Sequence, residues 1–133
     1  MDSLARDVMS TTVSTLKADT TVENALKALV NKKVTGMPVV NEKKQMIGML
    51  SEYDILKQIA KQKVFNSENF HEPIEFATSV QSIRDDTPLN EIVHLFVNAK
   101  YRRLPVVNEN GELVGIITRR DLMKVFYYRA KLT

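Results

Sequence analysis

Apolar residues recur at helical spacing in two parts of the chain, and each stretch follows residues typical of a helix start. The stripes are Val22, Ala25, Leu26, Leu29 and Val30 in the first stretch, and Leu89, Ile92, Val93, Phe96 and Val97 in the second. This spacing predicts two amphipathic helices. Thr20 with Glu23 predicts a capping box at the first helix, and Thr87 followed by Pro88 predicts the start of the second.

Two short apolar runs follow the first predicted helix, at residues 37–41 and 46–50, and a polar loop separates them. This pattern indicates a β-hairpin, and the same pattern recurs after the second helix. The second hairpin loop contains Asn110-Gly111, a pair favoured in tight turns. The first contains Lys43-Lys44, which is a poorer turn sequence and predicts a looser loop.

Each hairpin leads directly into a further predicted helix, from residue 51 to about 61 and from residue 118 to about 129. A short strand is expected before the first amphipathic helix, at residues 12–14. The predicted order is therefore strand, helix, strand, strand, helix, and it occurs twice.

The two halves are copies of one sequence pattern. Pro-Val-Val-Asn-Glu occurs at residues 38–42 and again at 105–109, Gly115 lies 67 positions after Gly48, and Asp121 lies 67 positions after Asp54. Two copies of this length favour a pseudo-symmetric pair of small folds over a solenoid, which usually needs three or more repeats.

We therefore expect an α+β fold in which two pseudo-symmetric β-α-β-β-α repeats pack through their sheets. The expected boundaries are 1–62 for the first repeat, 63–76 for a connector and 77–133 for the second repeat. Phe65 and Phe70 predict that the connector folds back over the sheet.

Composition narrows the function classes. The chain has 133 residues, of which 44% are hydrophobic, and a net charge of +3. It contains no cysteine, which excludes disulfides, thiolate metal ligands and thiol nucleophiles. The charged N-terminus and the absence of a membrane-length apolar run argue against a signal peptide and a membrane partner, so a cytoplasmic protein is the default expectation.

The opening Asp7-Val8-Met9-Ser10, the repeated Pro-Val-Val-Asn-Glu, the glycine that follows it and the final Ser/Thr-x-x-Asp occur in a fixed order. Together they resemble the cystathionine-β-synthase (CBS) domain family. The resemblance implies a free-standing tandem pair that is not an enzyme and that requires no cofactor. It further implies clefts between the repeats that bind an adenosine ligand such as AMP, ADP, ATP or S-adenosylmethionine, and a homodimer of pairs.

Ser51 with Asp54, and Thr118 with Asp121, place a hydroxyl and a carboxylate three residues apart at a helix start. One interpretation is structural, because this spacing is close to a capping box. The other follows from the resemblance, which assigns the aspartate to the ribose hydroxyls and the Ser or Thr to ribose or phosphate. A carboxylate has two acceptor oxygens for such a diol, and a helix start favours phosphate.

The arginines of the second repeat are the expected phosphate ligands. Arg102 and Arg103 precede Leu104-Pro105, and Arg120 precedes Asp121. A guanidinium can hold two phosphate oxygens at once. The first repeat has Thr35-Gly36 in the corresponding place, so we expect two unequal clefts.

By resemblance, each cleft combines the head of one repeat with the tail aspartate of the other. The implied sets are Asp54 with Ser79, Val80 and Arg103, and Asp121 with Thr12, Val13 and Thr35.

The leading hypothesis is an adenosine sensor whose ligand changes the arrangement that a regulated partner recognises. Three other functions compete with it. The apolar final helix allows a structural or interaction module that dimerises or docks on a partner with empty clefts. Nucleic-acid binding has only the mild positive charge in its favour and no recognition motif. An enzyme is the least favoured, and His71 and His94 lack the neighbours of a metal site.

Overall fold

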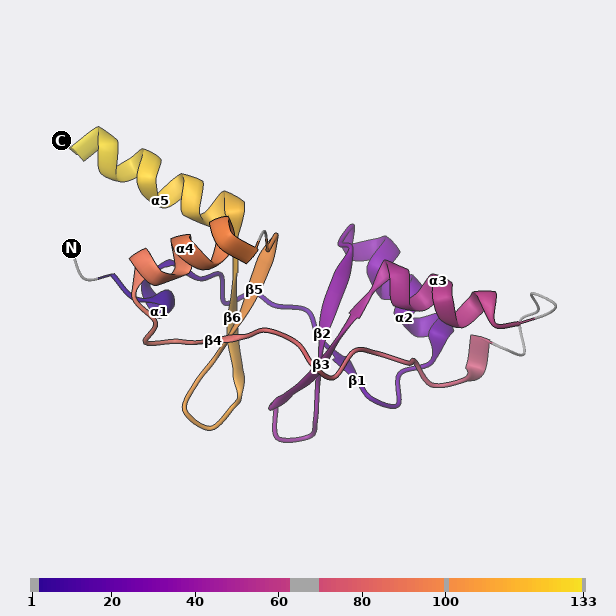
Figure 1. Cartoon of the computed structure of the whole chain (residues 1–133). Coiled ribbons are helices and arrows are strands. Elements are labelled where there is room, and N and C mark those ends of the chain that lie inside the picture. Colours follow the sequence, from indigo (N-terminus) through magenta and orange to yellow (C-terminus); the bar gives the residue numbers. More distant parts are fainter. Residues whose placement is uncertain (1–2, 63–69, 100, 133) are drawn as a thin grey trace. The chain divides into compact units, whose positions relative to one another are not determined.

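The computed structural model describes residues 3–62, 70–99 and 101–132, which form two compact units. The first unit is Ser14–Val80, and the second joins Met1–Val13 to Gln81–Thr133. The elements of the first unit are β1 (Leu16–Lys17), α2 (Val22–Lys32), β2 (Gly36–Val40), β3 (Met46–Ser51) and α3 (Glu52–Ala60). Those of the second are α1 (Ala5–Val8), β4 (Ile83–Arg84), α4 (Leu89–Ala99), β5 (Arg103–Val107), β6 (Leu113–Thr118) and α5 (Arg119–Leu132), as labelled in Figure 1.

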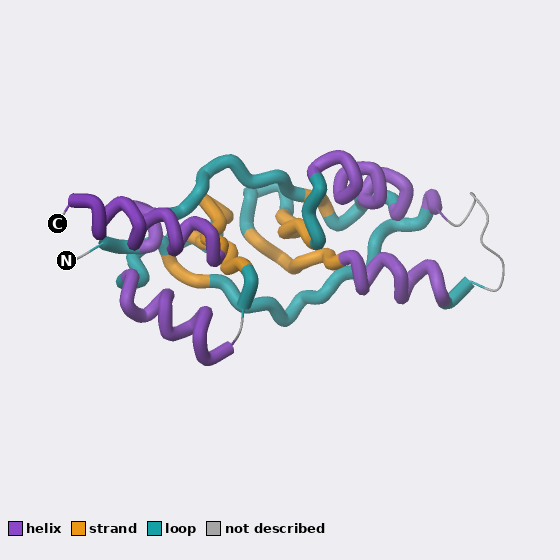
Figure 2. The backbone as a smooth tube through the Cα atoms, turned by 90° about the horizontal axis from the view of Figure 1, so that it is seen from above, coloured by secondary structure: helices purple, strands orange, loops and turns teal. Residues whose placement is uncertain are grey.

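Each unit contains one three-stranded sheet, in the order β1-β2-β3 or β4-β5-β6. The first two strands of each sheet are parallel, and the second and third form an antiparallel hairpin. Gly36 pairs with Ser51 in one hairpin, and Arg103 pairs with Thr118 in the other, so the two registers are equivalent. Figure 2 shows the strands of each unit beside its helices. The α+β fold and the repeated element order are thus confirmed.

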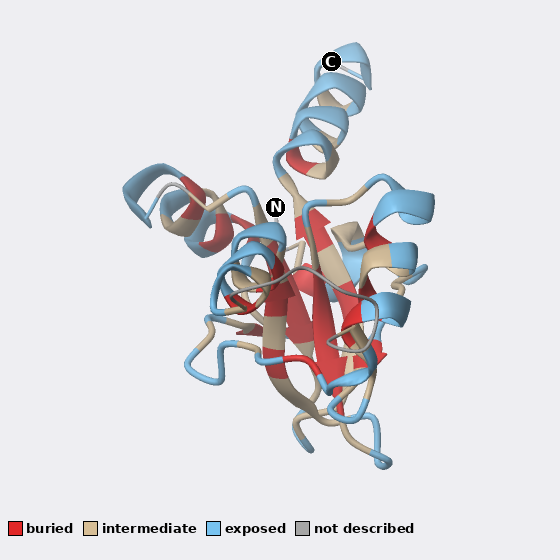
Figure 3. Cartoon of the chain, turned by 90° about the vertical axis from the view of Figure 1, so that its right-hand side faces the viewer, coloured by how far each residue is buried: buried red, intermediate tan, exposed pale blue. Residues whose placement is uncertain are grey.

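Each unit has its own apolar core, made by its sheet and the inner faces of its helices. In Figure 3 the strands and the helix faces turned toward them carry the buried residues. Val39 and Leu50 are fully buried in the first unit, as are Val106 and Ile117 at the equivalent positions of the second. Burying side chains of this size contributes about 1.5–3 kcal/mol each to folding. The central hairpin is therefore the apolar centre of each unit.

The segment that precedes each repeat pairs with the sheet of the other repeat. The backbone N–H groups of Ser10 and Ile116 each donate to the other residue's carbonyl at 2.9 Å. At the equivalent place in the first unit, Met49 and Ala77 exchange two hydrogen bonds of 2.9 and 3.0 Å. The N-terminal segment thus belongs to the second unit, and the segment through Ala77 belongs to the first.

Two glycines permit these crossings. A Cβ at Gly48 would overlap the Phe76 ring and lie 2.5 Å from the carbonyl oxygen of Ala77. A Cβ at Gly115 would overlap the Met9 side chain and lie 2.9 Å from the carbonyl oxygen of Ser10. The repeated glycine is required because another backbone passes at this point.

The two hairpin loops have the same turn geometry, so the prediction of a looser loop at Lys43-Lys44 is wrong. The Asn41 side-chain oxygen accepts from the backbone N–H of Lys43 and Gln45, and Asn108 makes the equivalent two bonds in the second loop. Lys44 has a φ of 63° and occupies the position of Gly111, with a φ of 79°. The asparagine, which begins both turns, fixes the loop even where no glycine is present.

The helix starts and the first strand differ from the sequence predictions by a few residues. The cap of α2 is Thr21, whose hydroxyl accepts from the Asn24 N–H at 3.2 Å. The Thr20 hydroxyl instead accepts from the backbone of Lys17. In the second unit the Pro88 carbonyl accepts from the Ile92 N–H, which puts Pro88 rather than Thr87 at the cap position.

The strand expected at residues 12–14 lies at Leu16–Lys17 instead. Leu16 is buried there and pairs with Val39, whereas Thr12 is exposed and lies outside any strand. The buried leucine, rather than the preceding β-branched residues, anchors the strand to the core.

The part of the connector that the structure describes packs on the first unit. Phe70 and Phe76 contact its core cluster, as the sequence predicted for Phe70, while Phe65 lies outside the described residues. Gln58 is buried, and its amide donates to the Pro73 carbonyl while its side-chain oxygen accepts from the Glu75 N–H, both at 2.9 Å. This one side chain therefore holds the returning segment from both polar ends.

Replacing Gly48 by alanine should destabilise the protein by about 1–3 kcal/mol, because the new methyl group overpacks against a ring and a backbone oxygen. Gly115→Ala should cost less, since the flexible Met9 side chain can move aside and Ser10 O lies farther away. Denaturant unfolding measures both changes. Equal stability of wild type and Gly48→Ala would show that the crossing is not closely packed.

Candidate functional site

The candidate site residues lie where the last strand of each sheet passes into a helix. In the first unit β3 ends at Ser51, whose hydroxyl accepts from the Asp54 N–H at 3.1 Å. Oδ2 of Asp54 in turn accepts from the Ser51 backbone N–H and from the Ser51 hydroxyl, both at 2.9 Å. This reciprocal pair is a capping box and fixes the carboxylate against the first turn of α3.

The second unit repeats this geometry with threonine. The Thr118 N–H donates to Oδ2 of Asp121 at 2.8 Å, and the Asp121 N–H donates to the Thr118 hydroxyl at 3.1 Å. The capping interaction predicted from the Ser/Thr-x-x-Asp spacing is thus present at both junctions. Aspartate is long enough to close the box, although glutamate or glutamine is more usual.

The caps use one oxygen of each carboxylate. Within residues 3–62, 70–99 and 101–132, no group donates a hydrogen bond to Oδ1 of Asp54 or of Asp121. Both side chains are half-buried. Because the hydrogen bonds to Oδ2 fix the carboxylate, they also fix the direction in which Oδ1 points. A carboxylate can accept about four hydrogen bonds in all, and each junction therefore retains acceptor capacity for a further partner.

The strand beside each junction brings further candidate residues close. Thr35 lies beside the first junction, because its carbonyl accepts from the Glu52 N–H at 2.9 Å. The equivalent bond joins the Arg119 N–H to the Arg102 carbonyl at 3.4 Å, and Arg103 pairs directly with Thr118. Arg102 and Arg103 therefore lie in the same unit as Asp121.

The two junctions differ in charge. The start of α5 holds Arg119 and Arg120, and the neighbouring strand β5 brings Arg102 and Arg103 beside it. The corresponding residues of the first unit are Thr35, Gly36, Glu52 and Tyr53. The Arg119 guanidinium donates to the Tyr101 carbonyl at 2.9 Å, which fixes one of these cations at the junction. The second junction is thus the one suited to an anionic group.

The remaining candidates follow the two crossing segments. Thr12 and Val13 come shortly after Ser10, in the unit of Asp121. Ser79 and Val80 come shortly after Ala77, in the unit of Asp54. In each pair the first residue is exposed and the valine is half-buried.

The predicted combinations of Asp54 with Arg103 and of Asp121 with Thr35 join residues of different units, and they stay predictions.

Other site types have no support in the described part of the chain. It holds no group of three or more His, Asp or Glu side chains placed to bind a metal ion. None of its helices has the length and apolar character needed to cross a membrane.

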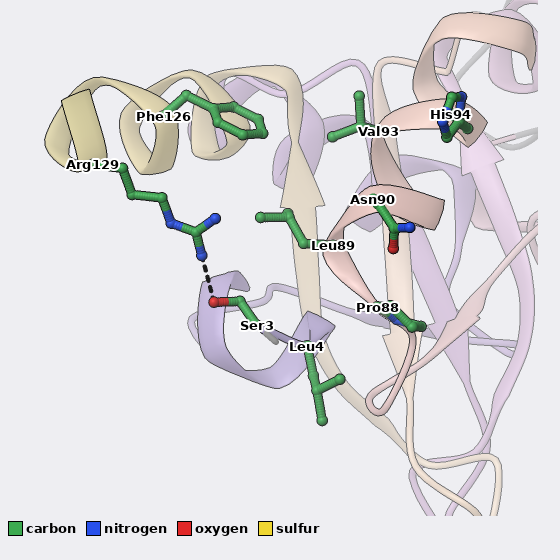
Figure 4. A pocket seen from close by; sticks show the side chains of 9 residues that line it. All are labelled: Ser3, Leu4, Pro88, Leu89, Asn90, Val93, His94, Phe126 and Arg129. Atoms are coloured by element: carbon green, nitrogen blue, oxygen red, sulfur yellow. Dashed lines mark hydrogen bonds between the residues drawn. The ribbon is translucent and has the colours of Figure 1, made fainter. Parts of the chain in front are cut away.

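Sequence reasoning missed a cavity of about 710 Å³ in the second unit (Figure 4). Ser3 and Leu4 line it from the N-terminal segment, together with residues of α4 and α5 such as Leu89, Phe126 and Arg129. No local pattern announces this cavity, because it depends on the N-terminal segment lying against the second repeat.

Comparison with protein families and with curated proteins identifies relatives of this chain. The model of the CBS domain family matches residues 5–61 and 75–128. The CBS domain-containing protein CBSX2 of Arabidopsis thaliana, described as chloroplastic, is 32% identical over 82% of this chain and 56% of its own length. An uncharacterized protein of Methanocaldococcus jannaschii is 32% identical over 90% of this chain and 41% of its own. The chain thus spans about half the length of these curated relatives.

Solved structures agree with the fold. The crystal structure of CBSX2 in complex with AMP has a TM-score of 0.80 and 31% identity, and the match covers 96% of this chain and 98% of that one. A putative acetoin utilization protein from Vibrio cholerae has a TM-score of 0.83 at 25% identity, with 99% and 96% coverage.

Replacing Ser51 by alanine should cost about 1 kcal/mol of stability, because the first turn of α3 loses its side-chain acceptor. Ser51→Thr is the matched control, since threonine already occupies the equivalent position of the second unit and caps it. Thermal unfolding compares the two variants. If the two variants have equal melting temperatures, the hydroxyl at this position does not stabilise the helix start.

Proposed function

The chain belongs to the CBS domain family, and we propose that it acts as a non-catalytic regulatory module that binds AMP or a related adenine nucleotide. An inosine-5′-monophosphate dehydrogenase of Aquifex aeolicus matches 83% of this chain over only 22% of its own length. A match to so small a part of an enzyme supports a regulatory role for this module rather than a catalytic one. The regulated partner and the ligand are both parts of this proposal.

The proposal rests on the carboxylate at each strand-to-helix junction, of which only one oxygen accepts the capping hydrogen bonds. Asp54 and Asp121 cap their helices through Oδ2 and retain an acceptor oxygen in a fixed orientation. A ribose diol offers two donors to such a carboxylate. We propose that each aspartate binds the ribose hydroxyls while Ser51 or Thr118 lies close to the sugar or phosphate.

The ligand class follows from charge. The arginines at the second junction favour a phosphate over the cationic sulfonium of S-adenosylmethionine. The AMP complex of CBSX2, which is 31% identical, supports the same choice. We therefore place AMP, ADP and ATP ahead of S-adenosylmethionine, with Arg102, Arg103 and Arg120 as proposed phosphate ligands and with Thr12, Val13, Thr35, Ser79 and Val80 as proposed cleft residues.

Regulation requires that the ligand bind two arrangements of the module unequally. Asp54 and Arg103 belong to different units, so a ligand that contacts both would favour one arrangement of the units over others. The regulated partner would respond to that arrangement.

The second candidate is an interaction module, and two apolar grooves favour it. One groove of about 250 Å³ lies between α2 and α3 beside Val30 and Leu56, and one of about 390 Å³ lies between α4 and α5 beside Val97 and Met123. These four side chains are each more than half exposed. Grooves of this kind suit a homodimer or a docked partner.

Substituting asparagine for Asp54 and for Asp121 tests the sensor function. The amide oxygen can take over the cap of Oδ2, whereas its NH₂ group cannot accept from ribose, so binding should fall while the fold persists. We expect each single variant to weaken AMP binding at one site by about tenfold, and the double variant to weaken it by about the same factor at both sites, as for hydrogen bonds to a charged group. Isothermal titration calorimetry measures affinity and stoichiometry.

Asp19→Asn is the control, since this exposed aspartate lies outside both junctions. Unchanged AMP binding in the double variant would leave both carboxylates with a capping role only. Absence of AMP binding to the wild type, with an intact dimer, would favour the interaction module.

A further inference from the structure

The cavity of the second unit is separate from the junction residues and has the composition of a ligand site. Its volume of about 710 Å³ falls within the range of about 300–1,000 Å³ that is typical of small-molecule pockets. Leu4, Leu89, Val93 and Phe126 give it apolar walls. None of the residues in the set of candidate nucleotide ligands lines it.

Polar groups enter this cavity from three elements, and all of them are neutral or cationic. Arg129 comes from α5, Asn90 and His94 come from α4, and Ser3 comes from the N-terminal segment. Figure 4 shows Arg129 and Phe126 on α5 on the same side of the cavity, with Leu89 of α4 between that helix and the N-terminal segment. No Asp or Glu lines the cavity among the described residues.

Arg129 is the fixed charge of the cavity. Its guanidinium donates to the Ser3 hydroxyl, which holds it in place without neutralising it (Figure 4). Within the described ranges, no carboxylate forms an ion pair with it. A half-buried guanidinium that has a neutral partner and spare N–H donors is suited to an anion, because it can bind a carboxylate, sulfonate or phosphate through two bonds at once.

We propose that this cavity binds a small organic anion that has an apolar or aromatic body. The acidic group pairs with Arg129, and the body packs against Phe126, Leu89 and Val93. Phe126 is 43% exposed, so such a body would cover part of its apolar surface.

The first repeat lacks this combination. At an offset of 67 positions, Ile59 stands for Phe126, Gln62 for Arg129 and Glu23 for Asn90. Glu23 lies 3.7 Å from the His71 ring and adds a negative charge where the second repeat has none. The proposed anion site is therefore a property of the second unit, which joins the N-terminal segment to the second repeat.

Two fluorescent probes of the same shape test the proposal on the full chain. 8-Anilinonaphthalene-1-sulfonate carries an anionic group, and N-phenyl-1-naphthylamine is its neutral counterpart. With AMP at saturating concentration, the sulfonate should still bind the wild type, and Arg129→Gln should weaken it by about tenfold, as for the loss of a charge-assisted bond. The neutral probe should bind both proteins equally.

Phe126→Ser should weaken both probes, because the aromatic wall serves the body of either one. Lys124→Gln is the matched control, since Lys124 is an exposed cation of α5 that does not line the cavity. Circular dichroism establishes that each variant is folded.

Sulfonate binding that Arg129→Gln leaves unchanged would overturn the proposal, and so would displacement of the sulfonate by AMP. The Arg129 comparison holds whether or not AMP binds, so failure of the nucleotide proposal and failure of this one are separate outcomes.

Discussion

The division of this chain into two compact units depends on backbone hydrogen bonds at two edge strands. β3 and β6 are the last strands of their sheets, and an uncovered edge exposes unpaired N–H and C=O groups. Ala77 pairs with Met49 on one edge, and Ser10 pairs with Ile116 on the other. Because each covering segment comes from outside the repeat that it covers, neither compact unit coincides with one sequence repeat.

The same crossings determine which candidate residues share a unit. Met49 lies two positions before Ser51, and Ile116 lies two positions before Thr118, so each crossing occurs next to a capped helix start. Thr12 and Val13 therefore enter the unit of Asp121, and Ser79 and Val80 enter that of Asp54. The glycines leave room for the crossing, and the capping aspartates fix the adjacent acceptors.

Local patterns predict the hairpins, the helices α2, α3, α4 and α5 and the capping aspartates, because each depends on residues a few positions apart. The covered edges could not be predicted this way, since Ser10 and Ile116 are distant in sequence and the only local trace is the glycine. Lys43 and Lys44 alone do not indicate the turn, because the Asn41 side chain fixes it. The cavity of the second unit is likewise not evident from local sequence, since its lining joins the N-terminal segment to α4 and α5.

In the proposed nucleotide site, a carboxylate engaged in a helix cap through one oxygen binds a ribose diol through the other. Calorimetric titration of the wild-type chain with AMP and with 2′,3′-dideoxy-AMP tests it directly, because the two ligands differ only in the hydroxyls. We expect AMP to bind and the dideoxy compound to bind at least about tenfold more weakly, because it lacks the bonds to a charged acceptor. Equal affinities would contradict it and would leave Asp54 and Asp121 as caps alone.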